Sequence, residues 1–297
     1  MKRLRILAGW GIIVLTVLVF INFIRSNPGV WWQLQKTRPS TIIFVLLGYA
    51  AMTGVLTLLY KVMTDICKVN IPAKENMLLT MYSNVVNFFG PLQSGPGFRL
   101  VYLKRKYKIN VPAYIGVSLL YYVCFAVVSG LMLLSGVFGW WILALFGLAV
   151  VSIYFGMPKV LRHPRAKKLI PQILPIKALG VLMMLSIVQV FVVAVIYFTE
   201  LRSLSGGVSF GQAIIYTGAA NFALFVSLTP GALGFRESFL YFSRDLHGIN
   251  ESTIVAANIL DRGVYVVFLG ILFLVILGMH GHKKLTKVVP ESSLIDG

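Results

Sequence analysis

Residues 228–237 read LTPGALGFRE, and they interrupt an otherwise apolar part of the chain with a Pro-Gly break that is closely followed by an Arg-Glu pair. Apolar sequence precedes this stretch at residues 219–226 and resumes at residues 238–242. A helix that is both broken and charged at one point is uncommon in a membrane protein unless it lines a polar cavity. We therefore expect an integral membrane protein that handles a polar or anionic group inside the bilayer.

The composition is that of a polytopic membrane protein. Of the 297 residues, 58% are hydrophobic and 12% are charged, and several apolar runs are long enough to cross a bilayer. A net charge of +18 would suggest a nucleic-acid partner in a soluble protein, but here we expect basic cytoplasmic loops that face anionic lipid headgroups. Cys67 and Cys124 lie in or beside different apolar runs, so we expect free thiols, with no disulfide, metal site or cofactor.

Six apolar runs are predicted to span the membrane. They lie at about residues 6–24, 41–60, 114–134, 140–156, 178–198 and 253–278. Lysine and arginine accumulate in loops on the cytoplasmic side, which places both termini in the cytoplasm of a multi-pass plasma-membrane protein. In this topology Glu200 and Arg202 fall in an exterior loop.

Two shorter apolar segments are predicted to be re-entrant helical hairpins. Residues 76–90 return through residues 98–107, whose basic cluster would face outward if the first segment crossed the membrane completely. Residues 212–226 lead into the opening stretch and return through residues 238–246. The expected breaks are Pro91, Pro96 and Gly97 in the first hairpin, and Pro230, Gly231 and Gly234 in the second.

The order of these elements divides the all-helical chain into an inverted repeat. Residues 1–135 and 136–280 each read as three spans and one hairpin, and residues 281–297 read as a cytoplasmic tail. An odd number of spans per half turns the second half upside down, which is typical of transporters whose site lies between the repeats. Short matches support the repeat, although chance matches are common in apolar sequence. They are Gly-Phe-Arg at residues 97–99 and 234–236, and Ile-Asn at residues 109–110 and 249–250.

Arg99 and Arg236 carry the chemistry predicted for the hairpins. Each lies in the first turn of a helix expected to begin just after Gly97 or Gly234, where unpaired N–H groups favour an anion. Arginine keeps its charge when desolvated and can bind phosphate through two parallel hydrogen bonds. The alternative is that these arginines pair internally or reach the membrane surface, and it is stronger for Arg99, which a basic cluster follows.

Asp261 and Arg262 lie roughly 12–14 Å into the last predicted span, near the membrane midplane. We expect Asp261 to pair with Arg236, and Arg262 to pair with Glu237. The cluster is interpreted either as a gate or substrate cage, or as a purely structural ion-pair lock. Further asparagines could line the path or join helices, and for each one alone we expect the joining role, while further tyrosines are expected to pack. They are Asn84, Asn87, Asn221, Asn258, Tyr121, Tyr122 and Tyr216.

The run at residues 229–237, together with the two hairpins, resembles the membrane region of lysylphosphatidylglycerol synthase and its stand-alone flippase-like relatives over essentially the whole chain. The resemblance implies a role in lipid translocation. Gly-Phe-Arg at residues 97–99 departs from the family pattern, which often has an acidic residue between the glycine and the arginine. The chain also lacks the soluble aminoacyl-transferase domain of the fused synthases, so we do not expect it to make aminoacyl lipid itself. The matching motif residues are Pro230, Gly234, Arg236, Glu237 and Arg262.

We therefore predict a flippase-like transporter that moves a phospholipid or lipid-linked anionic headgroup by alternating access. The alternative is a membrane enzyme or an accessory subunit of lipid or glycan modification without transport of its own. No catalytic constellation is recognisable, although Glu237 and Asp261 could serve as acid and base. The expected partners are membrane lipids, with no nucleic acid, and the oligomeric state stays open. The predicted substrate-binding residues are Arg99, Arg236, Glu237, Asp261 and Arg262.

Overall fold

The computed structural model describes residues 37–89, 94–148, 176–226 and 235–280, together with residues 35 and 151, and within these ranges all regular secondary structure is helical. Four helices are long and apolar enough to cross a membrane, judged by length and composition. They confirm an all-helical polytopic membrane protein and match four predicted spans. The predicted span at residues 6–24 and most of the span at 140–156 lie outside the described residues, but residues 141–148 are helical. The four helices are α3 (Pro39–Ile66), α6 (Val111–Phe138), α9 (Ile176–Leu204) and α13 (Glu251–His280).

Local sequence signals fix where two of the long helices begin. Asn110 precedes α6, and its side-chain oxygen accepts a hydrogen bond from the backbone N–H of Ala113 at 3.1 Å. Asn250 precedes α13, and its side-chain oxygen accepts from the backbone N–H of Thr253 at 2.9 Å. An asparagine at this position satisfies one of the N–H groups that the first helical turn leaves unpaired. The two Ile-Asn matches noted in the sequence therefore make the same type of helix start.

The shorter helices form two antiparallel hairpins. In the first, α4 (Ala73–Phe89) is followed by α5 (Ser94–Tyr107), and the Glu75 carboxylate ties the base by accepting from Lys106 at 2.7 Å and Tyr107 at 2.8 Å. In the second, α10 (Phe210–Val226) is followed by α11 (Phe235–Phe242) and α12 (Arg244–His247). The Gln212 side chain ties this base by donating to the carbonyl oxygen of Gly248 at 3.3 Å.

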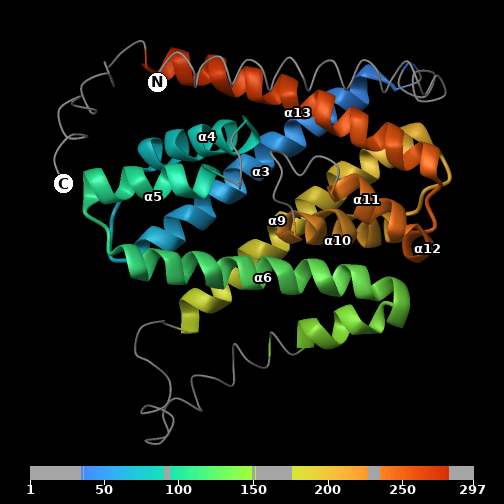
Figure 1. Cartoon of the computed structure of the whole chain (residues 1–297), viewed down its shortest axis with the longest axis horizontal. Helices are drawn as coiled ribbons and strands as arrows, with labels where there is room; N and C mark the ends of the chain where they lie inside the picture. Colours follow the sequence, from blue (N-terminus) through green and yellow to red (C-terminus); the bar gives the residue numbers. More distant parts are fainter. Residues whose placement is uncertain are drawn as a thin grey trace, which may run out of the picture.

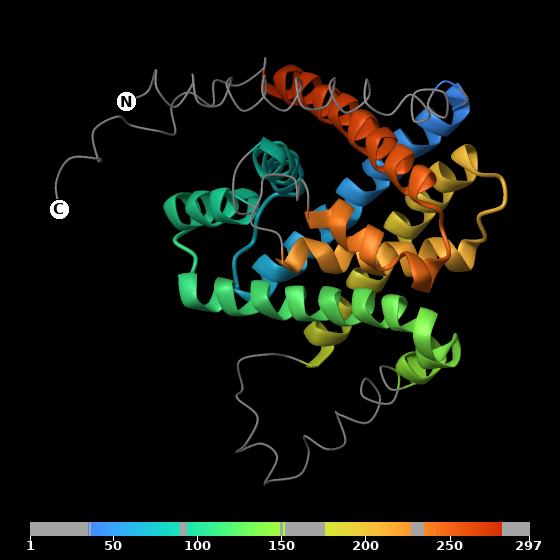
Figure 2. The same cartoon turned by 45° about the vertical axis from the view of Figure 1, so that its right-hand side comes forward.

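The bases of the two hairpins lie at opposite ends of the molecule, the first at the left and the second at the right of Figures 1 and 2. The chain at their tips, residues 90–93 and 227–234, lies outside the described residues. The predicted breaks at Pro91, Pro230, Gly231 and Gly234 fall in these two gaps.

The predicted start of α5 after Gly97 is wrong by about one turn. The helix begins at Ser94, so Pro96 and Gly97 belong to its first turn. Proline is tolerated there because the first N–H groups of a helix have no partner within the helix. Gly95 permits close packing on α4, since a Cβ atom at this position would lie 2.6 Å from the carbonyl oxygen of Ser83. The described part of α11 begins at Phe235, and the residues on which its predicted start depends lie outside the described residues.

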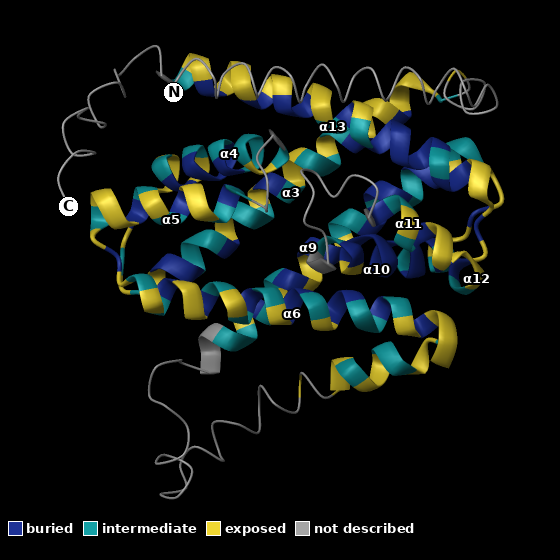
Figure 3. Cartoon of the chain, viewed as in Figure 1, coloured by how far each residue is buried: buried dark blue, intermediate teal, exposed yellow. Residues whose placement is uncertain are grey.

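The core is built around α9 and α10, while the outer helices keep apolar side chains exposed. In Figure 3, α10 is largely buried, whereas α6 and α13 each carry an exposed face. Leu119 on α6 and Leu274 on α13 are 60% and 67% exposed, as expected for side chains that contact lipid. Gly218 lets α10 approach α6, because a Cβ atom there would lie 2.4 Å from the backbone nitrogen of Leu133.

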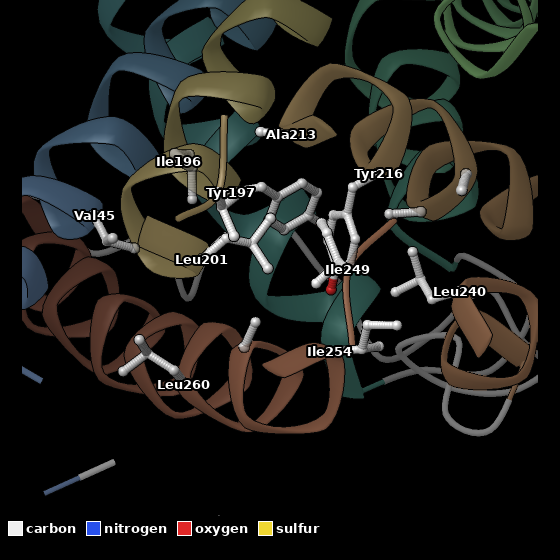
Figure 4. Packing of buried hydrophobic residues seen from close by; sticks show 14 of the residues in the cluster. Val45, Ile196, Tyr197, Leu201, Ala213, Tyr216, Leu240, Ile249, Ile254 and Leu260 are labelled. Atoms are coloured by element: carbon white, nitrogen blue, oxygen red, sulfur yellow. The ribbon is translucent and has the colours of Figure 1, made fainter. Parts of the chain in front are cut away.

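The buried cluster in Figure 4 joins α3, α9, α10, α11 and α13. At its centre the Tyr197 ring of α9 meets the Tyr216 ring of α10 edge to face, with centroids 5.4 Å apart. Leu240 of α11 and Leu260 of α13 pack into the same cluster. This packing holds α11 against α10 and α13, and holds α13 against α9.

Candidate functional site

A cavity of about 310 Å³ lies between the hairpins and the four long helices. Its wall combines tyrosine rings, amide side chains and charged groups, a mixture typical of a site for a ligand with both polar and apolar parts. The charged groups in the wall are Arg236, Asp261 and Arg262. The amides and a selection of the tyrosines are Asn84, Asn87, Gln189, Asn221, Tyr49, Tyr60, Tyr121, Tyr122 and Tyr197.

The Arg236–Asp261 pair joins α11 to α13 inside the protein. Nη2 of Arg236 donates to the carboxylate of Asp261 at 2.6 Å, and the two side chains are only 11% and 6% exposed. The Tyr49 hydroxyl of α3 donates to the other carboxylate oxygen of Asp261. The guanidinium of Arg236 also lies 5.3 Å from the centre of the Tyr197 ring. Ring face, hydroxyl and carboxylate together compensate a charge that would be costly to bury alone.

The Arg262–Glu237 pair forms a second connection beside the first. Arg262 donates from Nη2 and Nε to the same oxygen of Glu237, at 2.6 and 3.0 Å. The Glu237 side chain is 37% exposed, so this pair is better hydrated than Arg236–Asp261. Both predicted pairings are confirmed, and neighbouring residues of α11 thus hold neighbouring residues of α13.

Two buried hydrogen-bond donors at the cavity have no partner within the described part of the chain. They are Nε of Arg236 and the side-chain nitrogen of Asn221. A buried donor without an acceptor costs free energy, and donors left over in a cavity wall suit a ligand that brings oxygen acceptors. The arrangement can therefore accept the oxygens of a phosphate or a hydroxylated headgroup.

Arg99 lies apart from this cluster. Its side chain is fully buried, donates to the amide oxygen of Asn76 on α4, and lies 4.2 Å from the centre of the Tyr60 ring. Tyr60 itself lines the cavity, but Arg99 is not among the described residues of the cavity wall. The structure therefore brings together four of the five predicted binding residues and separates Arg99 from them.

The expected polar and aromatic residues fill several roles. Asn84, Asn87 and Asn221 line the cavity, as one of the two expected roles. Asn84 also joins α4 to α3 by donating to Thr53, and Asn87 joins α4 to α5 by accepting from the N–H of Gly95, both at 3.3 Å. Asn258 instead donates to the carbonyl oxygen of Ile254 in its own helix. Tyr121 and Tyr122 were expected only to pack, but both rings are part of the cavity wall, and the Tyr121 hydroxyl donates to Gln189 at 3.0 Å. Tyr216 is buried in the core cluster, as expected. Residues 68 positions apart become neighbours here, which no local pattern indicates.

The prediction that Glu200 lies in an exterior loop is wrong. Helix α9 continues to Leu204, and the Glu200 side chain is fully buried, while Arg202 is exposed and lies over the Phe198 ring. Glu200 shares the helix face of Tyr197, one turn earlier, which lines the cavity. A helical periodicity that runs past the end of the apolar stretch was the available signal.

Titratable groups also hold the hairpin bases. Burial alone would raise the pKa of Glu75, but hydrogen bonds from Lys106, Tyr102 and Tyr107 lower it below its ordinary value. Burial lowers the pKa of His247, whose ring accepts from the N–H of Ile249 at 3.2 Å and, as the neutral tautomer, donates to a backbone carbonyl. Both hairpin bases therefore depend on protonation states that prevail near neutral pH, an ionised Glu75 and a neutral His247.

The protein family described as the lysylphosphatidylglycerol synthase TM region matches residues 6–272. The match covers both hairpins, the membrane helices α3, α6 and α9, and most of α13 including its charged residues. No curated protein and no solved structure matches the chain.

Proposed function

Because the chain belongs to the lysylphosphatidylglycerol synthase transmembrane-region family, a membrane family of lipid-handling proteins, we propose that it is a flippase-like transporter. Its substrate is a phospholipid or a lipid-linked anionic headgroup, which crosses the membrane by alternating access. The plasma membrane is the proposed location, with both termini in the cytoplasm.

The cavity is the observation that carries this proposal. It lies within an apolar helical bundle, yet the described residues of its wall include two arginines, four amide side chains and two donors without a partner in the described part of the chain. A cavity of about 310 Å³ can hold a headgroup while acyl chains remain among the exposed apolar side chains of the outer helices. Arg236 and Arg262 would bind the phosphate, with Asp261 and Glu237 as their partners in the empty state.

The arrangement of the hairpins supports alternating access. Their bases lie at opposite ends of the molecule, and Asn110 and Asn250 start the helices that follow them in the same way. We interpret residues 1–135 and 136–280 as inverted repeats, each with one re-entrant hairpin, and residues 281–297 as a cytoplasmic tail. In this interpretation each hairpin gates the cavity from its own side of the membrane.

The test of transport uses vesicles of phosphatidylcholine and phosphatidylglycerol that contain the purified protein and a fluorescent phosphatidylglycerol. An impermeant reductant bleaches only the outer leaflet, so bleaching of inner-leaflet label reports flipping. The variant Arg236→Gln/Asp261→Asn removes both charges without leaving one unpaired. We expect it to flip lipid at least tenfold more slowly than wild type, about 1.4 kcal/mol in activation free energy. The matched control Arg202→Gln removes an exposed arginine and should retain the wild-type rate.

Wild-type vesicles that bleach like protein-free vesicles would refute transport of this lipid class. Equal flipping by wild type and the double variant would refute the proposed binding site. Cysteine labelling tests the topology separately, since Lys104 and Arg244, near the two hairpin bases, should react from opposite sides of the membrane. Reaction of both from one side would refute the inverted repeat.

A further inference from the structure

Glu200 is a buried carboxyl group that the proposed headgroup site does not use. It lies on α9 four residues before the helix ends at Leu204, and its side chain is fully buried. Neither carboxylate oxygen has a hydrogen-bond partner within the described residues. Tyr197, one turn earlier on the same face, belongs to the cavity wall. Glu200 therefore lies between the cavity and the end of the bundle at the base of the second hairpin.

The charges that act on Glu200 come from two other helices. Asp261 of α13 and Arg236 of α11 both interact electrostatically with Glu200. Three phenol groups also interact electrostatically with Glu200, namely Tyr49 of α3, Tyr197 of α9 itself and Tyr216 of α10.

One arginine therefore interacts electrostatically with two buried carboxyl groups, and its ion pair, at 2.6 Å, is with Asp261. An ionised carboxylate without water or a hydrogen bond is strongly disfavoured, and a like charge nearby adds to the penalty. The cluster is electrically balanced when Asp261 is ionised and Glu200 carries a proton.

We propose that Glu200 is the proton carrier of this transporter and couples headgroup movement to the proton gradient. The inference rests on the proposed lipid transport and adds the proton as its second substrate. While Arg236 is paired with Asp261 and the site is dry, Glu200 is a neutral carboxylic acid. When the second hairpin moves and water enters, its O–H bond breaks, the proton passes to water, and the carboxylate is stabilised by Arg236. Reprotonation from the aqueous phase restores the starting state.

The coupling follows from competition for Arg236. A phosphate that binds this guanidinium draws it from both carboxyl groups, so a bound anion favours the protonated form of Glu200. Loss of the headgroup leaves Arg236 with its carboxylates, and Glu200 can then release its proton. The proton and the headgroup thus affect each other's affinity through the shared side chain of Arg236. Coupled transport requires at least such a mutual effect.

The first experiment detects the proton directly. Infrared difference spectra of the protein in phosphatidylcholine and phosphatidylglycerol vesicles should show the carbonyl stretch of a protonated carboxylic acid near neutral pH. Glu200→Gln should abolish that band and fold normally, because glutamine has the shape of the neutral acid. Glu251→Gln, which changes an exposed glutamate at the start of α13, should leave the band in place.

The second experiment imposes a pH gradient of one unit on vesicles that contain fluorescent phosphatidylglycerol. Wild-type flipping should change by up to about tenfold, the ratio of proton activities across the membrane. Glu200→Gln should lose this response, and Glu251→Gln should keep it.

Three results would overturn the inference while leaving lipid transport intact. The first is a wild-type infrared spectrum without the band of a protonated carboxylic acid. The second is a wild-type flipping rate that does not respond to the pH gradient. The third is a Glu200→Gln protein that fails to fold, because that result would indicate an ionised carboxylate with a structural role. Absence of any lipid movement by wild type would instead overturn the proposed function, and the coupling with it.

Discussion

Replacing Asp261 by asparagine is expected to destabilise the protein more than any other single neutralisation in the charged cluster. The substitution keeps the size of the side chain but leaves Arg236 buried without its carboxylate, and the new amide N–H₂ group can face the guanidinium as a second donor. Removing one partner of a buried pair typically costs about 3–5 kcal/mol. Both side chains are well below one third exposed, at 11% and 6%, so solvent screens this loss only weakly.

Two further variants test the reasoning. Glu237→Gln breaks the neighbouring pair, but Glu237 is 37% exposed, so the cost should be about 1 kcal/mol or less. Arg236→Gln/Asp261→Asn removes both members of the buried pair and should recover most of the loss, because no charge is left without a partner. Glu200 offers Arg236 a substitute carboxylate, so Asp261→Asn should cost more in a Glu200→Gln background than in the wild type.

The assay is reversible denaturant unfolding in detergent micelles, followed by far-ultraviolet circular dichroism, with the wild type, each single variant and each double variant compared at one pH and detergent concentration. The claim that the buried Arg236–Asp261 pair contributes more than the Arg262–Glu237 pair is refuted if Asp261→Asn lowers the free energy of unfolding no more than Glu237→Gln. It is refuted equally if the double variant loses the sum of its two single losses, because the charges would then act independently.

Three other outcomes are expected from the packing and the hairpin bases. Gly218→Ala should destabilise by about 1–3 kcal/mol in the same unfolding assay, because its Cβ atom would meet the α6 backbone, whereas Gly263→Ala, with open space around it, should be neutral or slightly stabilising. The folded pKa of Glu75 lies below its ordinary value of 4.5. The contribution of Glu75 to stability is therefore present above pH 4.5 and is lost as the pH falls through the folded pKa. The stability difference between wild type and Glu75→Gln should shrink with acidification. The folded pKa of His247 lies below 6.5, so its contribution is likewise lost on acidification, and His247→Gln should flatten the pH dependence of stability below that value.

The charged cluster was predictable because Asp261 and Arg262 lie in the middle of a long apolar run, where each charge is costly. Each of the helices α11 and α13 carries one arginine and one acidic residue side by side. Only a few pairings of opposite charges between the two helices are then favourable. Glu200 gave no such signal, since it lies at the end of an apolar run and resembles the start of a loop. Its one sequence signal was the helical periodicity past the apolar run, and the structure shows that α9 continues to Leu204 and buries this side chain.

Pro96 illustrates a different difficulty of the sequence. Proline near glycine indicates a break, yet the same residue fits the first turn of a helix, and the two interpretations differ by only a few residues. Packing of Gly95 against Ser83 decides between them. Likewise, the contact between Tyr121 and Gln189 exists because α6 packs against α9, a tertiary fact that neither helix records alone.

The two arginines of the Gly-Phe-Arg matches differ in how their charges are compensated. Arg99 is held by Asn76 and the Tyr60 ring, and within the described residues it has no ion-pair partner. Arg236 is paired with Asp261, which lies on a different helix. The contacts of Arg99 bind it to the first hairpin, α3 and α6, and none of them is an ion pair. The pairing of Arg236 can change whenever α11 moves relative to α13, because each member belongs to a different helix. Movement of the second hairpin is therefore the step at which a bound anion could replace a carboxylate, and the first hairpin keeps a fixed positive charge behind the cavity wall.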